Sequence, residues 1–148
     1  RYHPVFFHPQ FNCPAECTVE AGAALTRLAN AGVNLGNQMV LLKGVNDDAG
    51  IIADVNRWLV RHRCRPYYLF LTERVKGTAH FWVSVEDALN IAGELRRTLS
   101  GIAMPSVVVD TPDGGGKVPL TADNVALADG EAFVTDLQGR SVRVRDSG

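Results

Sequence analysis

The residue with the most specific chemical potential in this sequence is Lys117, which directly follows three consecutive glycines, Gly114, Gly115 and Gly116. Glycines let the backbone approach a ligand closely because they carry no Cβ atom. A lysine in this place could form a Schiff base with a carbonyl cofactor or act as a point charge for a phosphate group. A solvated lysine in a flexible turn is the third interpretation.

The phosphate-binding P-loop motif does not fit this segment. That motif requires glycine at position 111 and serine or threonine at position 118, whereas the chain has Thr111 and Val118. The Schiff-base, point-charge and turn-lysine interpretations of Lys117 therefore remain open on the residues alone.

Two carboxylates are expected at the same end of the fold as Lys117. Glu73 closely follows a predicted strand at 66–71, and Asp110 ends a predicted strand at 105–110. Ligands bind at the carboxyl ends of parallel strands, so the two side chains would form a site that receives a cation. Each carboxylate could instead pair with an arginine or with a helix amino terminus.

Gln38 is a polar residue within a predicted apolar strand at 35–42. Burying an amide is costly unless it has hydrogen-bond partners. Gln38 is therefore either a ligand contact or a core amide with its partners satisfied, and the spacing alone does not decide between these two interpretations.

The elements that must position these residues alternate between strands and helices. Apolar periodicity and capping residues predict a helix from Thr18 to about residue 31, a helix that begins at Asn46 or Asp47, and a helix from Ser84 that ends before Gly101. Predicted strands are 4–11, 35–42, 66–71 and 105–110, with 111–117 as a loop. Short strands at 125–128, 131–135 and 141–145 predict an antiparallel meander.

This order predicts an α/β fold with parallel strands, right-handed crossovers and cover on both faces of the sheet. Four strands do not close an eight-stranded barrel, so the fold class is part of a barrel or an open sheet, followed by a small antiparallel β tail. We place the boundary between two regions after residue 110, with βα units at 1–110 and the lysine loop and meander at 111–148.

Composition excludes several classes of protein. The chain has 148 residues, 15 Lys+Arg against 16 Asp+Glu, and a formal net charge of −1, so no strong field attracts nucleic acid or a membrane surface. No apolar run approaches the roughly 20 residues of a spanning helix. We expect a cytoplasmic protein with a small-molecule partner.

The three cysteines do not indicate a disulfide scaffold or a metal site. Cys13 and Cys17 have the first spacing of a CxxxCxxC iron–sulfur loop, but Glu20 stands at the third position, and two thiolates do not hold a four-iron cluster. We expect no metal ligands in this chain.

Several stretches together resemble the carboxyl-terminal part of the lysine 2,3-aminomutase family. They occur in the family's order across nearly the whole chain, at 1–5, 31–38, 41–48, 65–69, 77–81, 99–101 and 109–120, the last containing Gly114-Gly115-Gly116-Lys117-Val118-Pro119-Leu120. Each stretch is weak by itself, but the set is highly specific.

The resemblance implies a radical S-adenosylmethionine isomerase with a partial (βα) barrel that migrates an amino group of lysine or a related cationic amino acid. Lys117 matches the lysine that holds pyridoxal phosphate, beside Gly114, Gly115 and Gly116. Glu73 and Asp110 match the two acidic residues that bind the side-chain ammonium of the substrate, with Glu73 in place of the usual aspartate. Gln38 matches a residue that lines the S-adenosylmethionine site.

The sequence also departs from the family's pattern. The CxxxCxxC loop that binds the [4Fe-4S] cluster lies upstream in the family, so we expect this chain to be a fragment that is inactive alone and homo-oligomeric as part of the full-length protein. Asp48 stands where some members carry a zinc-binding cysteine, so no zinc is expected. The alternative function is a non-catalytic α/β module that binds pyridoxal phosphate or a partner chain.

Overall fold

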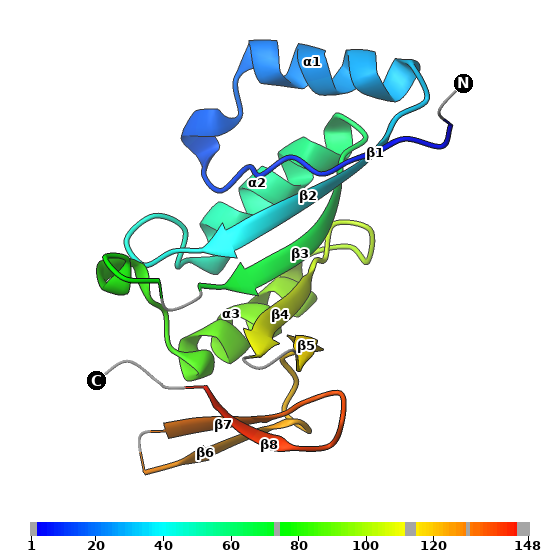
Figure 1. Ribbon diagram of the computed structural model, residues 1–148. Helices are drawn as coiled ribbons and strands as arrows, with labels where there is room; N and C mark the ends of the chain where they lie inside the picture. The colour runs from blue at the N-terminus through cyan, green and yellow to red at the C-terminus, as the bar shows by residue number, and fades with distance from the viewer. Residues whose placement is uncertain (1–2, 73–74, 112–114, 130, 145–148) are drawn as a thin grey trace.

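Four parallel strands and one antiparallel strand form the main sheet of the computed structural model, which describes residues 3–72, 75–111, 115–129 and 131–144 (Figure 1). The strand order is β1-β2-β3-β4-β5, in the order of the chain. The strands are β1 (Phe6–Phe7), β2 (Asn34–Leu41), β3 (Arg65–Leu71), β4 (Ser106–Thr111) and β5 (Gly116–Pro119). Strands β1 to β4 are parallel, and β5 runs antiparallel to β4.

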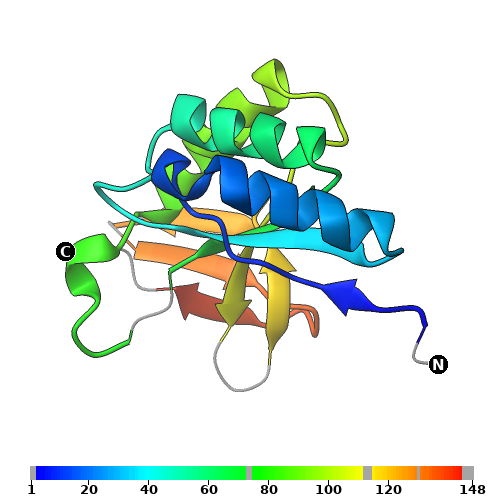
Figure 2. The same ribbon diagram turned by 90° about the horizontal axis from the view of Figure 1, so that it is seen from above.

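The three α-helices all lie on one side of this sheet, as Figure 2 shows. They are α1 (Val19–Asn30), α2 (Ala49–Arg61) and α3 (Val85–Thr98), with short 3-10 helices at Pro14–Glu16 and Ala79–Phe81. The sequence predicts cover on both faces of the sheet, and within the described residues the helices supply it on one face only. An α/β fold is confirmed, whereas closure of a partial barrel and the boundary after residue 110 stay predictions.

Helix capping follows the sequence at two of the three α-helices. The hydroxyl of Thr18 accepts a hydrogen bond from the Ala21 amide at the start of α1, and that of Ser84 accepts one from the Asp87 amide at the start of α3. The prediction of Asn46 or Asp47 as the cap of α2 is wrong, because Asp48 holds that position.

Asn46 is instead a buried structural residue. Its amide oxygen accepts a hydrogen bond from Leu42 N at 2.7 Å, and its amide nitrogen donates to Asn12 O and Val40 O, both at 2.8 Å. Asn46 therefore ties the end of β2 to the neighbouring first segment and cannot also cap a helix.

The first strand is much shorter than the predicted 4–11. Side-chain amides continue its pairing with β2 beyond Phe7: Asn37 Oδ1 accepts from Phe11 N at 2.7 Å, and Asn12 Oδ1 accepts from Val40 N at 2.8 Å. Side chains thus replace a regular backbone ladder along this edge.

The core lies between the sheet and its helices. Strands β2, β3 and β4 send alternate apolar side chains to the helical side, where α2 and α3 cover them. The buried residues include Met39, Leu41, Leu69, Leu71, Val107 and Val109 from the strands, and Ile52, Val55, Leu59, Ala88, Ala92 and Leu95 from the helices. Burial of each large apolar side chain stabilises the fold by about 1.5–3 kcal/mol.

The segment predicted as a loop at 111–117 is in part a β-hairpin. Thr111 is the last residue of β4, and Gly116 and Lys117 begin β5, with Thr111 paired to Gly116 and Asp110 paired to Lys117. Propensity rules misread this segment because a strand that opens with glycine and lysine has little apolar pattern.

The predicted meander is confirmed as a separate three-stranded antiparallel sheet. Its strands are β6 (Val125–Ala128), β7 (Glu131–Thr135) and β8 (Ser141–Val144), in the order β6-β7-β8. This second sheet lies beside the β5 edge of the main sheet (Figure 1). No helix within the described residues is long and apolar enough to cross a membrane.

Candidate functional site

The side of the main sheet opposite the helices, here called the open face, carries the polar and aromatic residues of the candidate site. Gln38 of β2, Tyr68 and Phe70 of β3, Asp110 of β4 and Lys117 of β5 all point to it. Their neighbours Met39, Leu69 and Val109 point to the core, and side chains alternate between faces along a strand.

Asp110 and Lys117 form the centre of this site. They are directly opposed in the antiparallel β4–β5 pair, and Lys117 Nζ donates a hydrogen bond to Asp110 Oδ1 at 3.2 Å. Their side chains are 28% and 47% exposed, respectively, so a small molecule can reach both charges. The structure therefore brings together two of the residues that the sequence singled out.

An aromatic row borders this ion pair. Lys117 Nζ lies 5.4 Å from the centroid of the Phe70 ring, and the Phe70 and Tyr68 rings are 5.2 Å apart. A cation held over an aromatic ring is attracted by the negative face of the ring. The amine of Lys117 is thus held by a carboxylate and by an aromatic surface.

Tyr68 also receives a hydrogen bond from the hydroxyl of Tyr67 at 3.2 Å. Hydrogen bonding with Tyr67 raises the pKa of Tyr68, and burial and the proximity of Tyr67 and Asp110 act in the same direction. Tyr68 therefore stays a neutral hydroxyl on the open face. Sequence reasoning missed this row, although Tyr68, Leu69, Phe70 and Leu71 alternate between aromatic and aliphatic residues.

Gln38 lies on the same face, further from the ion pair. It is half-buried and its register partner in β3 is Tyr68, beside an irregularity in the ladder at Asn37 and Gln38. The buried amide of β2 is Asn37, which bonds Phe11 at both its oxygen and its nitrogen. The core-amide role that the sequence considered for Gln38 thus belongs to its neighbour.

Two predicted site residues, Glu73 and Gly114, lie outside the described residues. The other two glycines form the turn side of the hairpin: Gly115 is buried, and Gly116 has a φ of +84°. A Cβ atom on Gly115 would overlap Thr111 Oγ1 and would lie 3.3 Å from Asp136 Oδ2. Any larger residue at position 115 would therefore force Thr111 or the hairpin to move.

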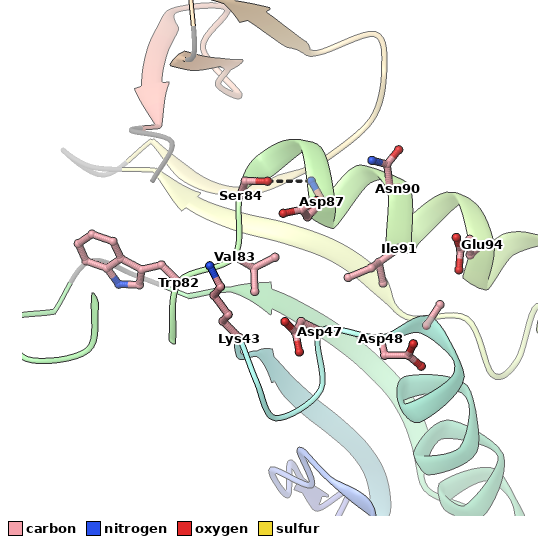
Figure 3. A pocket seen from close by; sticks show the side chains of 11 residues that line it. Lys43, Asp47, Asp48, Trp82, Val83, Ser84, Asp87, Asn90, Ile91 and Glu94 are labelled. Carbon is pink, nitrogen blue, oxygen red and sulfur yellow. Dashed lines mark hydrogen bonds between the residues drawn. The ribbon is translucent and has the colours of Figure 1, made fainter. Parts of the chain in front are cut away.

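A hollow of about 350 Å³ opens elsewhere on the molecule, between the amino ends of α2 and α3 (Figure 3). The charged, hydroxyl and amide side chains that line it are Lys43, Asp47, Asp48, Ser84, Asp87, Asn90 and Glu94. Asp48 and Ser84 are also the N-cap residues of the two helices. None of the open-face residues lines this hollow, so it is separate from the candidate site.

The cysteines are free thiols and do not join the site. Cys64 is fully buried, and burial raises its pKa to about 11. Burial, followed by the nearby Glu16 and Cys13, raises the pKa of Cys17 to about 11 as well. Within the part of the chain that the structure describes, no three His, Cys, Asp or Glu side chains are grouped as metal ligands.

Comparison with known proteins gives relatives of one enzyme type. The glutamate 2,3-aminomutase of Clostridioides difficile is 49% identical over 120 residues, which are 81% of this chain and 28% of that protein. The L-lysine 2,3-aminomutases of Methanococcus maripaludis and Clostridium subterminale are each 41% identical over 143 residues and 91% of this chain. No protein-family model matches the chain.

The matched segment covers 33% of the Methanococcus protein and 34% of the Clostridium protein. The chain therefore spans about a third of the length of these curated relatives.

Proposed function

Because the chain belongs to the lysine 2,3-aminomutase family over the segment that it spans, we propose that it is part of an isomerase that moves an amino group between adjacent carbons of an amino acid. The proposed mechanism is radical and uses S-adenosylmethionine and pyridoxal phosphate. Lys117 would hold pyridoxal phosphate, and Asp110 would bind the side-chain ammonium of the substrate.

The observation that carries this proposal is the pairing of Asp110 and Lys117 at 3.2 Å on an accessible sheet face. A primary amine, a carboxylate and two aromatic rings converge there, and the backbone at Gly115 and Gly116 carries no Cβ. These groups fit pyridoxal phosphate, which when bound supplies the carbonyl carbon that takes up an amino group. The protein supplies the amine and a flat apolar surface beside it.

Asp110 supports a cationic substrate. A carboxylate on the open face attracts an ammonium group and repels a second carboxylate. Relatives named for lysine and for glutamate both match this chain. The choice of substrate is therefore argued from the residues of the site. We propose lysine or a related cationic amino acid, with Glu73 as the second acidic contact.

The remaining cofactors belong to the same proposal. Gln38 would contact S-adenosylmethionine, because it lies on the open face in the strand next to Tyr68. The ligands of the four-iron cluster would come from another part of the protein, because Cys13 and Cys17 supply only two thiolates. We further propose a cytoplasmic homo-oligomer that binds neither nucleic acid nor a membrane.

The test is chemical labelling of the intact protein. Incubation with pyridoxal phosphate followed by borohydride should leave a stable label on the peptide that contains Lys117. Lys117→Arg should abolish that label, whereas Lys43→Arg should keep it. A label confined to Lys43 or Lys76, or no label on the Lys117 peptide, would overturn the proposal.

A further inference from the structure

We infer that Asp136 is a positioning residue for Lys117: the turn at 136–140 of the second sheet holds the Gly115–Gly116 backbone, and this backbone carries Lys117. The functional meaning of this inference rests on the proposed role of Lys117. Its structural part stands on contacts between the second sheet and the β4–β5 hairpin.

Asp136 is a buried carboxylate that its own turn satisfies completely. Its side chain has no exposed surface, and it accepts hydrogen bonds from Gln138 N at 2.9 Å, Arg140 N at 2.8 Å and Arg140 Nε at 2.7 Å. Burying a charge is costly unless such partners are present. The turn is therefore a rigid unit built around one side chain.

Burial alone raises the pKa of Asp136. The hydrogen bonds from the Arg140 amide, the Arg140 guanidinium and the Gln138 amide outweigh that effect, and the pKa lies below its usual range. Asp136 therefore stays ionised at neutral pH, and its hydrogen-bond acceptors remain available to the turn.

This rigid turn lies directly against both glycines of the hairpin. A Cβ atom on Gly115 would lie 3.3 Å from Asp136 Oδ2, and a Cβ atom on Gly116 would lie 3.3 Å from Leu137 Cδ1. On the other side, Thr111 Oγ1 donates a hydrogen bond to Gly116 O at 3.0 Å. The glycine backbone is thus held between β4 and the turn of the second sheet.

The packing of the Gly115–Gly116 backbone between β4 and the turn at 136–140 is here called the clamp. The position of Lys117 depends on this clamp because Lys117 follows Gly116 directly in the chain. The pairs Thr111–Gly116 and Asp110–Lys117 are consecutive rungs of the same ladder. A shift of Gly116 would move the Lys117 amine relative to Asp110 and Phe70. The second sheet therefore acts as a support for the reactive end of the main sheet.

The experiment compares Asp136→Asn with Glu131→Gln in the intact protein. Both changes turn an acid into its amide in the second sheet, but Glu131 pairs with Arg143 and touches neither glycine. Leu137→Ala is a third variant at an exposed side chain, and it removes the methyl groups that lie beside Gly116 while the carboxylate turn stays intact.

Two readouts are used for each variant. The first is the extent of pyridoxal phosphate and borohydride labelling of Lys117, relative to Lys43 in the same sample. The second is hydrogen–deuterium exchange of the amides of β5, relative to those of β3. Exchange reports the hairpin without any cofactor, so it keeps the structural inference separate from the proposed role of Lys117.

We expect Asp136→Asn to lower the Lys117 label by roughly tenfold, since a misplacement of about 1 Å can cost a reacting group up to roughly 100-fold. Exchange in β5 should become faster, whereas Glu131→Gln should change neither readout. Leu137→Ala should shift both readouts in the same direction, and it decides the question if Asp136→Asn does not fold.

Unchanged label and unchanged β5 exchange in a folded Asp136→Asn or Leu137→Ala protein would overturn the inference. If Lys117 is not labelled in the parent protein, the proposed function fails. In that case β5 exchange alone confirms or contradicts the clamp.

Discussion

Asp110 Oδ1 lies 3.2 Å from Lys117 Nζ across two antiparallel strands, so the site holds an ion pair before any ligand is present. Half-exposed ion pairs contribute little to stability, about 0–1 kcal/mol. Another cation can therefore replace Lys117 as the partner of Asp110 at little cost in stability. If the Lys117 amine turned away from Asp110 to hold a cofactor, Asp110 would be left with an unpaired carboxylate that a substrate ammonium could satisfy.

Asp110→Asn should weaken the use of a cationic amino acid by the intact protein. Loss of one charge-assisted hydrogen bond costs about 1.5–3 kcal/mol, which corresponds to roughly a 10- to 150-fold fall in kcat/KM with lysine. Steady-state kinetics with lysine and with an uncharged analogue of the same length measure the effect, which should be absent for the uncharged analogue.

The amount of pyridoxal phosphate bound provides the control for Asp110→Asn. Binding should change much less than kcat/KM, because Lys117 is still present. Unchanged kinetics with lysine would assign Asp110 to a purely structural role as the partner of Lys117.

Asn46→Ala should destabilise the protein by about 2–4 kcal/mol, because it removes three hydrogen bonds from a fully buried side chain and leaves their partners unsatisfied. Asn90 is exposed on α3, and Asn90→Ala is the matched control, expected within about 0.5 kcal/mol of the parent. Denaturant unfolding measures both. Equal midpoints would show that Asn46 does not hold β2 to the first segment.

The sequence was sufficient to predict the elements whose pattern is local. Thr18 and Ser84 cap helices as expected, and the strands of the meander lie where the turn pair Gln138-Gly139 and the turn residue Asp129 predict them. Asp129 and Gly139 do adopt positive φ angles of 52° and 77°. Capping and tight turns depend on a few neighbouring residues, so they can be read without the fold.

Features that depend on distant residues could not be read in this way. Asn46 resembles a helix cap by sequence, but Asn12 and Val40 recruit it into the edge of the sheet. The sequence singles out Lys117 and Asp110 as candidates, whereas their direct pairing follows from β5, a strand with little apolar pattern. The support from Asp136 has no sequence signal, because it joins two sheets through space.

Cys64 should make the protein less stable at alkaline pH. Burial raises its pKa to about 11, against a weaker opposing hydrogen bond from the Asn37 backbone. The folded state therefore keeps a proton that the unfolded state has lost, and this contribution to stability is complete below about pH 8.5 and is lost as the pH rises towards 11. The slope for one such proton is at most about 1.4 kcal/mol per pH unit.

Comparison with Cys64→Ala isolates this effect, because other groups that titrate in the same range are common to both proteins. The free energy of unfolding of the variant should fall less steeply between pH 9 and 11. Parallel curves for the two proteins would contradict the role of Cys64.

Gly115→Ala should disturb the site although it adds a single methyl group. That group would overlap Thr111 Oγ1, which bonds Gly116 O, and would lie 3.1 Å from Thr111 Cβ. Relief requires a movement of the hairpin or of Thr111, at a cost of about 1–3 kcal/mol. Lys117 follows in the same hairpin, so labelling by pyridoxal phosphate and borohydride should also fall, and Gly115→Val should have a larger effect.

Gly101→Ala is the matched control for this prediction. A Cβ atom there would meet no atom within 4 Å, and Gly101 has no positive φ angle. Loss of glycine flexibility in the unfolded chain should make this variant neutral, or more stable by up to about 1 kcal/mol, with the Lys117 label unchanged. Thermal unfolding and peptide mapping compare the variants. If Gly115→Ala matched Gly101→Ala in both, position 115 would have free space, and the close packing of Thr111, Gly115 and Asp136 could not be what holds Lys117 in place.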